Sequence, residues 1–317
     1  MRTKLSTFVL AFALAHLCAG LASAQASVEV KSLAARLGYP ADAKLLIVHA
    51  DDLAAAHTIN AATFKAFETG LVSSGSVMVP CPWLPEVAAY ARSHPDADLG
   101  LHLTLTSEWK TYRWGGVLSK ERAPTLYAAD GYLYPTEDVA AAHIDVREAE
   151  AEVRAQIERA RAFGLRPTHL DAHMRTLYTT RPLFEMLLRV AREERLPVMV
   201  SREWFGEAPF LPAALGPDGI VLDRVLGADP SVRPERWAEF YTDLIKNLKP
   251  GVSELIVHLA SDDEEMRAVA QDHPDWGAAW RQRDFDFVTG ETFRRLLKEN
   301  NVKLITWREI GKLLTKP

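Results

Sequence analysis

Cysteine is nearly absent from this sequence, since only Cys18 and Cys81 occur among its 317 residues. Cys18 lies in an N-terminal segment that we expect to be cleaved, so the mature chain cannot form an internal disulfide. Cys81 lies in the apolar stretch VPCPW, and we interpret it as a buried packing residue. A disulfide-based fold is therefore excluded, and a catalytic thiol is disfavoured.

An excess of basic residues is also missing. The chain holds 37 Lys and Arg residues against 42 Asp and Glu residues, which gives a formal net charge of −5. Proteins that bind nucleic acids through the phosphates usually present a basic face. The composition therefore predicts no nucleic-acid partner.

Long apolar runs are missing except at the N-terminus. There, Arg2 and Lys4 precede a mostly apolar stretch at residues 5–21 and a small-residue ASA site that ends at Ala24. This order is typical of a secretory signal, so we predict a signal peptide over residues 1–24, cleavage, and export to the periplasm or the exterior. A membrane anchor is the alternative, but the run is short and is interrupted by a histidine and a glycine. We expect no membrane span after cleavage.

Short apolar and β-branched runs alternate with amphipathic helical patterns along the mature chain, residues 25–317. Repeated β-then-α units predict a parallel sheet covered by helices. No linker or internal repeat interrupts them, so we predict one α/β domain, a TIM-barrel-like (β/α) barrel in regular or distorted form. The predicted strands are 45–50, 72–79, 99–105, 168–173, 197–201, 219–226, 254–259 and 303–307. The clearest predicted helices are 147–163, 181–195, 236–247 and 290–300.

Polar residues gather at the carboxyl ends of these predicted strands. Asp51 and Asp52 follow the first strand, His102 lies in the third, and His258 lies near the end of the seventh. The carboxyl ends of parallel barrel strands meet at one face, where barrel enzymes carry their chemistry. We therefore expect these side chains to converge.

A further polar group lies on the fourth strand, in the sequence THLDAH. Its members His169, Asp171 and His173 are two residues apart, so they share one side of the strand. A carboxylate with two imidazoles is a common set for a divalent metal that keeps open positions for water. Such a metal lowers the pKa of its water, and a second carboxylate can then take the proton.

Structural interpretations of the same residues stay open at this point. A single histidine on a strand is usually a hydrogen-bonded core residue, and two aspartates after a strand often form a turn or a helix cap. Asp52 in particular could cap a helix that begins at Leu53. The metal interpretation rests on the presence of several such groups at the same end of different strands.

Five segments occur in an order that is typical of one known family. They are ADDLAAAHTINAATFKAFETGLVSSGSVM, LGLHLTLT, AQIERARAFGLRPTHLDAHMR, SELIVHLAS and DFDFVTGETFRRLLKENNVKLITWREI. Together they extend over most of the chain from Leu45 onward. The chain therefore resembles the YdjC/ChbG-like carbohydrate deacetylases, metal-dependent sugar deacetylases with a barrel-like fold related to that of polysaccharide deacetylases.

The resemblance implies a role for each polar residue at the strand ends. It implies that Asp52, His102 and His173 bind a divalent metal ion, zinc or magnesium. It implies that Asp51 is the general base, and that His258 is an acid or an imidazole that orients the substrate.

Supporting roles are also implied by the resemblance. His169 and Asp171 would aim His173 or tune its basicity. Trp109 and Trp114, in the long loop after the third strand, would suit stacking on sugar rings, with anchoring of the loop as the alternative.

The chain departs from the family pattern near this site. The family usually has Asn at the position of His49 and Pro at the position of Leu259. It usually has Phe-Gly where this chain has Leu53 and Ala54. Arg175 stands where the family usually has a histidine, and we expect its cation to shift substrate choice toward a group with negative charge.

These observations predict an exported, metal-dependent hydrolase that removes N-acetyl or O-acetyl groups from a saccharide. The expected partner is an acetylated saccharide, and a homodimer stays open. One alternative is a saccharide-binding protein on the same fold with little or no turnover. Another is a metal-dependent hydrolase that acts on phosphoesters, which the small number of basic residues near the predicted ligands disfavours.

Overall fold

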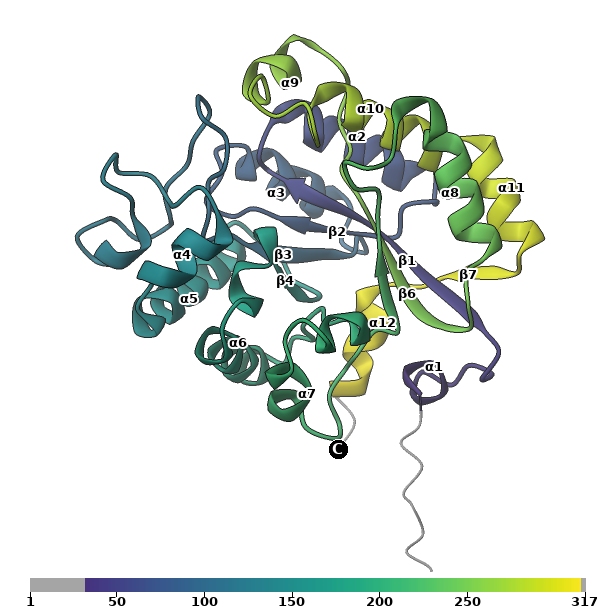
Figure 1. The fold of residues 1–317 in the computed structure, drawn as a ribbon, viewed down its shortest axis with the longest axis horizontal. Helices are drawn as coiled ribbons and strands as arrows, with labels where there is room; N and C mark the ends of the chain where they lie inside the picture. The colour runs from purple at the N-terminus through teal and green to yellow at the C-terminus, as the bar shows by residue number, and fades with distance from the viewer. Residues whose placement is uncertain (1–31, 315–317) are drawn as a thin grey trace, which may run out of the picture. The chain divides into compact units, whose positions relative to one another are not determined.

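The long strand β1 (Lys44–Leu53) lies at the centre of a parallel sheet (Figure 1). Its residues 45–48 are apolar and fully buried, which is typical of a strand covered on both faces. The computed structural model describes residues 32–314, and the predicted signal peptide at residues 1–24 lies outside them. Every ladder of the described sheet is parallel, as predicted.

β1 has partners along both of its edges. One edge pairs with β6, and the other pairs with β2 beside the carboxyl half of β1 and with β7 beside its first residues. The sheet order is β4-β3-β2-β1-β6-β5, with β7 attached to β1. The bounds are β2 (Ser74–Val77), β3 (Leu99–Leu103), β4 (Leu170–Ala172), β5 (Arg224–Leu226), β6 (Gly251–Val257) and β7 (Val302–Leu304).

Two isolated bridges join the outer strands of this sheet. Leu170 in β4 pairs with Val198 of the segment 197–201. Ser201, at the end of that segment, pairs with Leu222, just before β5. The amide of Leu222 donates to the carbonyl of Val200 at 2.8 Å. The sheet thereby closes into an irregular barrel, which confirms the predicted TIM-barrel-like fold in its distorted form.

Most of the predicted strands are shorter in the structure than the sequence suggested, and two of them are the least regular. The segment 197–201 forms only single bridges, and only the end of the predicted strand 219–226 is regular, as β5. Pro197 has no amide hydrogen to donate to a ladder. Gly219 weakens the start of the other segment, because glycine has no side chain to pack against the sheet and loses more conformational freedom in a strand.

Helices cover the outside of the barrel. In Figure 1, α8 and α11 lie beside β1 and β6, while α5 and α6 lie on the side of β3 and β4. The four clearest predicted helices are confirmed as α5, α6, α8 and α11, with ends that differ by one residue. The helices are α1 (Leu33–Arg36), α2 (His57–Glu68), α3 (Leu84–Ser93), α4 (Glu137–His143), α5 (Val146–Ala162), α6 (Arg181–Glu194), α7 (Phe210–Leu215), α8 (Trp237–Lys246), α9 (Glu264–Val269), α10 (Ala278–Val288), α11 (Glu291–Glu299) and α12 (Trp307–Gly311). Short 3-10 turns are η1 (Pro124–Leu126), η2 (His173–Tyr178), η3 (Arg202–Phe205), η4 (Pro234–Arg236) and η5 (Lys312–Leu314).

Local signals in the sequence mark where the main helices begin and end. Asp145 caps α5 by accepting a hydrogen bond from the amide of Arg147 at 2.8 Å, and Thr180 caps α6. None of the helices within residues 32–314 is long and apolar enough to cross a membrane. Cys81 is buried and free, in agreement with the packing role predicted for it.

Successive residues of β1 alternate between two apolar cores. Leu46 and Val48 pack with residues of α8 and α11 in one core, whereas Ile47 belongs to the other. The alternation of a strand then places His49 and Asp51 on the side of Ile47. Both polar residues therefore lie on one face of β1, where the barrel has to accommodate them.

The buried carboxylate of Glu152 on α5 anchors the loop that follows β3. It accepts hydrogen bonds from the amides of Val117 at 2.7 Å and Leu118 at 2.8 Å. Gln156, one turn further along α5, donates to Glu152 and also bonds the backbone of Thr104 at the start of the loop. α5 thus ties both parts of the loop to the barrel.

We predict that Glu152→Ala destabilises the protein by about 3 kcal/mol, because a buried amide and a half-buried amide lose their acceptor. Urea unfolding followed by circular dichroism measures the change. Glu158→Ala is the matched control, since Glu158 lies on the same helix but is exposed. Equal stabilities of the two variants would contradict the anchoring role.

Candidate metal centre and active site

A β-bulge near the end of β1 brings two neighbouring aspartates to the same site. Ala50 pairs with Gly75 and Leu53 with Val77, so β1 holds one more residue than β2 between these pairs. Asp52 within the bulge has a positive φ of 68°. This left-handed residue breaks the alternation, so Asp52 can face the same space as Asp51 instead of the opposite face.

Backbone hydrogen bonds hold the bulge in this conformation. The amide of Met78 donates to the carbonyl of Leu53 at 2.8 Å, and the amide of Ala54, which also has a positive φ of 77°, donates to Asn60 Oδ1 at 2.7 Å. α2 begins only at His57. The alternative in which Asp52 caps a helix from Leu53 is therefore wrong, because Leu53 still belongs to β1.

Three side chains from different elements converge beside the bulge. Asp52 Oδ1 lies 3.5 Å from His102 Nε2 and 3.6 Å from His173 Nδ1. His102 belongs to β3, and His173 follows β4 at the start of η2. All three are buried, and their ligand atoms lie within 4.8 Å of one another, as in a group that can hold a metal ion.

The second nitrogen of each imidazole is held by a carboxylate. His102 Nδ1 lies 2.8 Å from Asp171 Oδ1, and His173 Nε2 lies 2.9 Å from Glu108 Oε2. Each carboxylate accepts the hydrogen of that nitrogen, so the other nitrogen, which is directed toward Asp52, can offer its lone pair to a metal once it is deprotonated. Asp171 therefore aims His102, whereas the sequence had suggested that it aims His173.

The donor set fits a divalent cation. Asp52 Oδ1 is buried without a hydrogen-bond partner, and its distances of 3.5–3.6 Å to the two imidazoles exceed those of ordinary hydrogen bonds. Asp52 Oδ2 is instead engaged by Arg281 Nη2 at 2.6 Å. One carboxylate oxygen and two imidazole nitrogens thus remain available, a set that suits zinc and related metals.

Charges around the centre keep Asp52 ionised and His173 protonated in the metal-free protein. Burial alone would raise the pKa of Asp52, but Arg281 and His173 outweigh it and hold this pKa well below its ordinary range. Burial would likewise lower the pKa of His173, but Glu108 and Asp52 raise it to about 10.

Asp51 lies beside the three convergent residues with its two oxygens in different surroundings. Its Oδ1 lies 3.1 Å from His49 Nε2 and accepts a hydrogen bond from Ser76 at 3.3 Å. Its Oδ2 lies 3.9 Å from both His102 Nε2 and His258 Nε2. The structure thus brings Asp51 and His258 next to the Asp52 group.

His169 lies away from the three convergent side chains. Its ring stacks on Trp307 with centroids 4.9 Å apart, and its nitrogens lie near Thr168 and Asp171. As the strand alternation predicted, His169 faces the same side as Asp171. Because it lies two residues earlier in the chain, its ring lies deeper in the barrel, next to the ring of His49. No described contact joins it to His173, so the suggested aiming role is not seen.

Both tryptophans of the loop after β3 are buried, each with 4% of its surface exposed. The Trp114 indole donates to the carbonyl of Thr106 at 2.8 Å, and the Trp109 ring packs edge-on against that of Trp114. In this conformation the two tryptophans anchor the loop, which is the role that the sequence offered as the alternative to stacking on sugar rings.

Arg175 lies at the exposed rim. It pairs with Glu207 at 2.9 Å and lies over the ring of Trp204. Its guanidinium therefore already has an anionic partner, and an anionic substrate group would have to compete with Glu207.

Glu108 and Arg281 are site residues that the sequence did not single out. Glu108 adjoins Trp109 in the long loop, and that position was the one signal that could have indicated it. Arg281 lies on α10, far along the chain from Asp52. Nothing in its local sequence distinguishes it from an ordinary exposed arginine.

A parallel barrel with a carboxylate and two imidazoles at the carboxyl ends of its strands belongs to the class of barrel proteins that could hold a metal ion at this face. The sequence profile of the YdjC-like protein family matches residues 45–299. The chain therefore belongs to the YdjC-like family, as the resemblance of its motifs predicted.

Relatives named carbohydrate deacetylase match most of the chain. It is 34% identical to a carbohydrate deacetylase of Thermus thermophilus, over 86% of this chain and 95% of the relative. It is 27% identical to a carbohydrate deacetylase of Geobacillus stearothermophilus, over 84% of this chain and 98% of the relative. The predicted class of enzyme is confirmed at the level of this family.

A solved structure with the same fold is also found. It is that of a candidate cellobiose-phosphate cleavage protein of Enterococcus faecalis, with a TM-score of 0.72 and 24% identity, covering 84% of this chain and 99% of that one. This likeness supports the barrel architecture.

We predict that divalent metal binding at pH 7 releases at least about one proton, because His173 must lose its proton before Nδ1 can bind a metal. The apparent affinity should then rise with pH up to about 10, the pKa of His173. Calorimetry in buffers of different ionisation enthalpy measures the release.

In Glu108→Gln the release should decrease, because the carboxylate that contributes most to raising the pKa of His173 is lost. Glu121→Gln, an exposed position in the same loop, is the control. Unchanged release in the Glu108 variant would contradict the protonation state assigned to His173.

Proposed function

We propose that the protein is an exported, metal-dependent carbohydrate deacetylase that hydrolyses N-acetyl or O-acetyl groups of a saccharide. The observation that carries this proposal is the convergence of Asp52, His102 and His173, with Asp51 and His258 beside them. Membership of a family that includes proteins named carbohydrate deacetylase supports it.

Asp52 Oδ1, His102 Nε2 and His173 Nδ1 would hold the cation, either zinc or magnesium. When bound, such a cation lowers the pKa of a water molecule and polarises a carbonyl group. Asp171, Glu108 and Arg281 would keep the three donor atoms in place. This division explains why so many charged groups are buried here.

Asp51 is the proposed general base. Its Oδ2 faces the centre and would take the proton of the attacking water as the oxygen bonds to the acetyl carbon. The same oxygen lies 3.9 Å from His258 Nε2. The proton taken from the water would pass to His258 once these two side chains approach within hydrogen-bond reach.

His258 would deliver this proton to the departing amine or alcohol as the bond to the acetyl carbon breaks. Burial lowers the pKa of His258 to about 4, so the imidazole is neutral at pH 7 and must receive a proton before it can give one. Asp284 accepts a hydrogen bond from the backbone amide of His258 at 3.0 Å and fixes the position of this residue.

Acetate release from a panel of acetylated saccharides tests the proposal, with the protein loaded in turn with zinc, magnesium, manganese or cobalt. We expect Asp51→Asn to keep the metal but to lose about 100-fold or more in kcat, because the general base is removed. His102→Ala should lose metal binding and activity together.

Asp138→Asn, an exposed aspartate on α4, is the control and should leave kcat unchanged. Metal binding without acetate release from any substrate would favour a saccharide-binding protein. Absence of metal binding at these residues would contradict the proposal as a whole.

Export is a separate part of the proposal, supported by the signal-like pattern of residues 1–24. Expression of the full chain in a bacterial host should yield a mature protein that begins at Gln25. Intact-mass analysis of the periplasmic and medium fractions measures this. Recovery of only the uncleaved chain in the cytoplasm would contradict export.

A further inference from the structure

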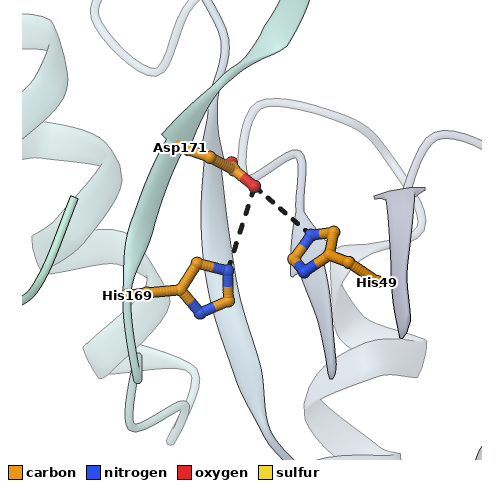
Figure 2. Close-up of side chains that lie close together, drawn as sticks. All are labelled: His49, His169 and Asp171. Atoms are coloured by element: carbon orange, nitrogen blue, oxygen red, sulfur yellow. Dashed lines mark ion pairs between the residues drawn. The ribbon is translucent and has the colours of Figure 1, made fainter. Parts of the chain in front are cut away.

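A second group of buried polar side chains lies deeper in the barrel than the candidate metal centre. It includes His49, His169, Asp171 and Glu254, all with no exposed surface. Figure 2 shows His49 and His169 both directed toward the carboxylate of Asp171, at 3.3 Å and 3.9 Å. His169, Asp171 and His49 lie close enough to hold a metal ion themselves.

The surroundings of His49 Nε2 indicate a hydrogen-bonded group instead of a second metal site. Nε2 lies 3.0 Å from Ser76 Oγ, and the Ser76 hydroxyl donates to Asp51 Oδ1 at 3.3 Å. Nε2 also lies 3.1 Å from Asp51 Oδ1 and 3.3 Å from Asp171 Oδ2, and because carboxylate oxygens only accept, the hydrogen in these contacts belongs to Nε2. A nitrogen that carries this hydrogen cannot bind a metal.

The other ring nitrogen of His49 also faces a carboxylate. Nδ1 lies 3.0 Å from Glu254 Oε1, which accepts a hydrogen bond from the Trp307 indole at 3.0 Å. Burial alone would lower the pKa of His49, but Glu254, Asp171 and Asp51 outweigh it and raise this pKa well above its ordinary value. A protonated His49 is therefore surrounded by three carboxylates and stabilises all of them.

We propose that His49 is a positioning residue for Asp51. Together with Ser76 it holds Oδ1 of Asp51 inside the barrel, so that Oδ2 is the oxygen directed to the metal centre. The consequence for catalysis rests on the proposed function, in which Asp51 is the general base. The contact between His49 and Asp51 does not depend on that function.

Two substitutions at His49 separate its contacts. The amide nitrogen of glutamine reaches about as far along the side chain as Nε2, whereas that of asparagine reaches only about as far as Nδ1. His49→Gln therefore keeps a donor toward Ser76 and Asp51, and His49→Asn keeps one only toward Glu254. Both variants lose the positive charge, so a difference between them reports the contact to Asp51.

We expect kcat for acetate release to fall about tenfold or more in His49→Asn, because a displaced base loses its alignment. KM and the metal affinity, measured by calorimetry, should stay within about threefold, since no proposed ligand is changed. His49→Gln should recover part of the lost kcat. His94→Asn, the same substitution at an exposed histidine, is the control.

Thermal melts identify variants that fail to fold, and the comparison is limited to those that remain folded. Equal kcat values for folded His49→Asn and wild type would overturn the inference. A loss of metal affinity in His49→Asn that parallels the loss of kcat would also overturn the inference, because His49 would then act on the metal centre as a whole.

A measurement without turnover separates this inference from the proposed function. In nitrogen-15 spectra of the metal-free, histidine-labelled protein, Asp51→Asn should shift the Nε2 signal of His49, and the exposed control Asp138→Asn should not. If the wild type releases no acetate, the proposed function fails, and this shift still supports the inference. If the Nε2 signal of His49 does not change in Asp51→Asn, the inference is overturned.

Discussion

The burial of several carboxylates close together is the constraint on which the site depends. Asp51, Asp52, Asp171 and Glu254 are all nearly or fully buried within the barrel, and buried like charges repel strongly. The chain balances them with Arg281 beside Asp52 and with the imidazoles of His49, His102 and His173. Removal of one partner leaves a buried charge without compensation, so these residues depend on one another.

The backbone of β1 determines how this charge is divided. An ordinary strand would direct Asp51 and Asp52 to opposite faces. The extra residue of the bulge and the positive φ at Asp52 bring both carboxylates to the same side. Neighbouring hydrogen bonds at Leu53 and Ala54 stabilise this conformation, which explains why an alanine tolerates a backbone region that favours glycine.

The sequence alone predicted the barrel and the convergence of Asp51, Asp52, His102 and His173, because parallel strands present their carboxyl ends at one face. It could not predict Glu108 or Arg281, which reach the site from a loop and from a helix over distances in the chain that no local pattern reports. It also associated Asp171 with His173, its neighbour in sequence. The structure instead pairs Asp171 with His102 on β3, because β3 and β4 are adjacent in the sheet.

The position of His49 connects the two buried groups. In the sequence this residue was a departure from the family pattern without an assigned role. In the barrel its imidazole lies between Glu254 on β6 and Asp51 at the bulge, and it also contacts Asp171, which aims His102. A single buried imidazole thus contacts Asp51, the proposed base, and Asp171, which holds the proposed ligand His102. Substitutions at His49 and Asp171 should therefore affect each other, since residues that share partners in one network seldom act independently.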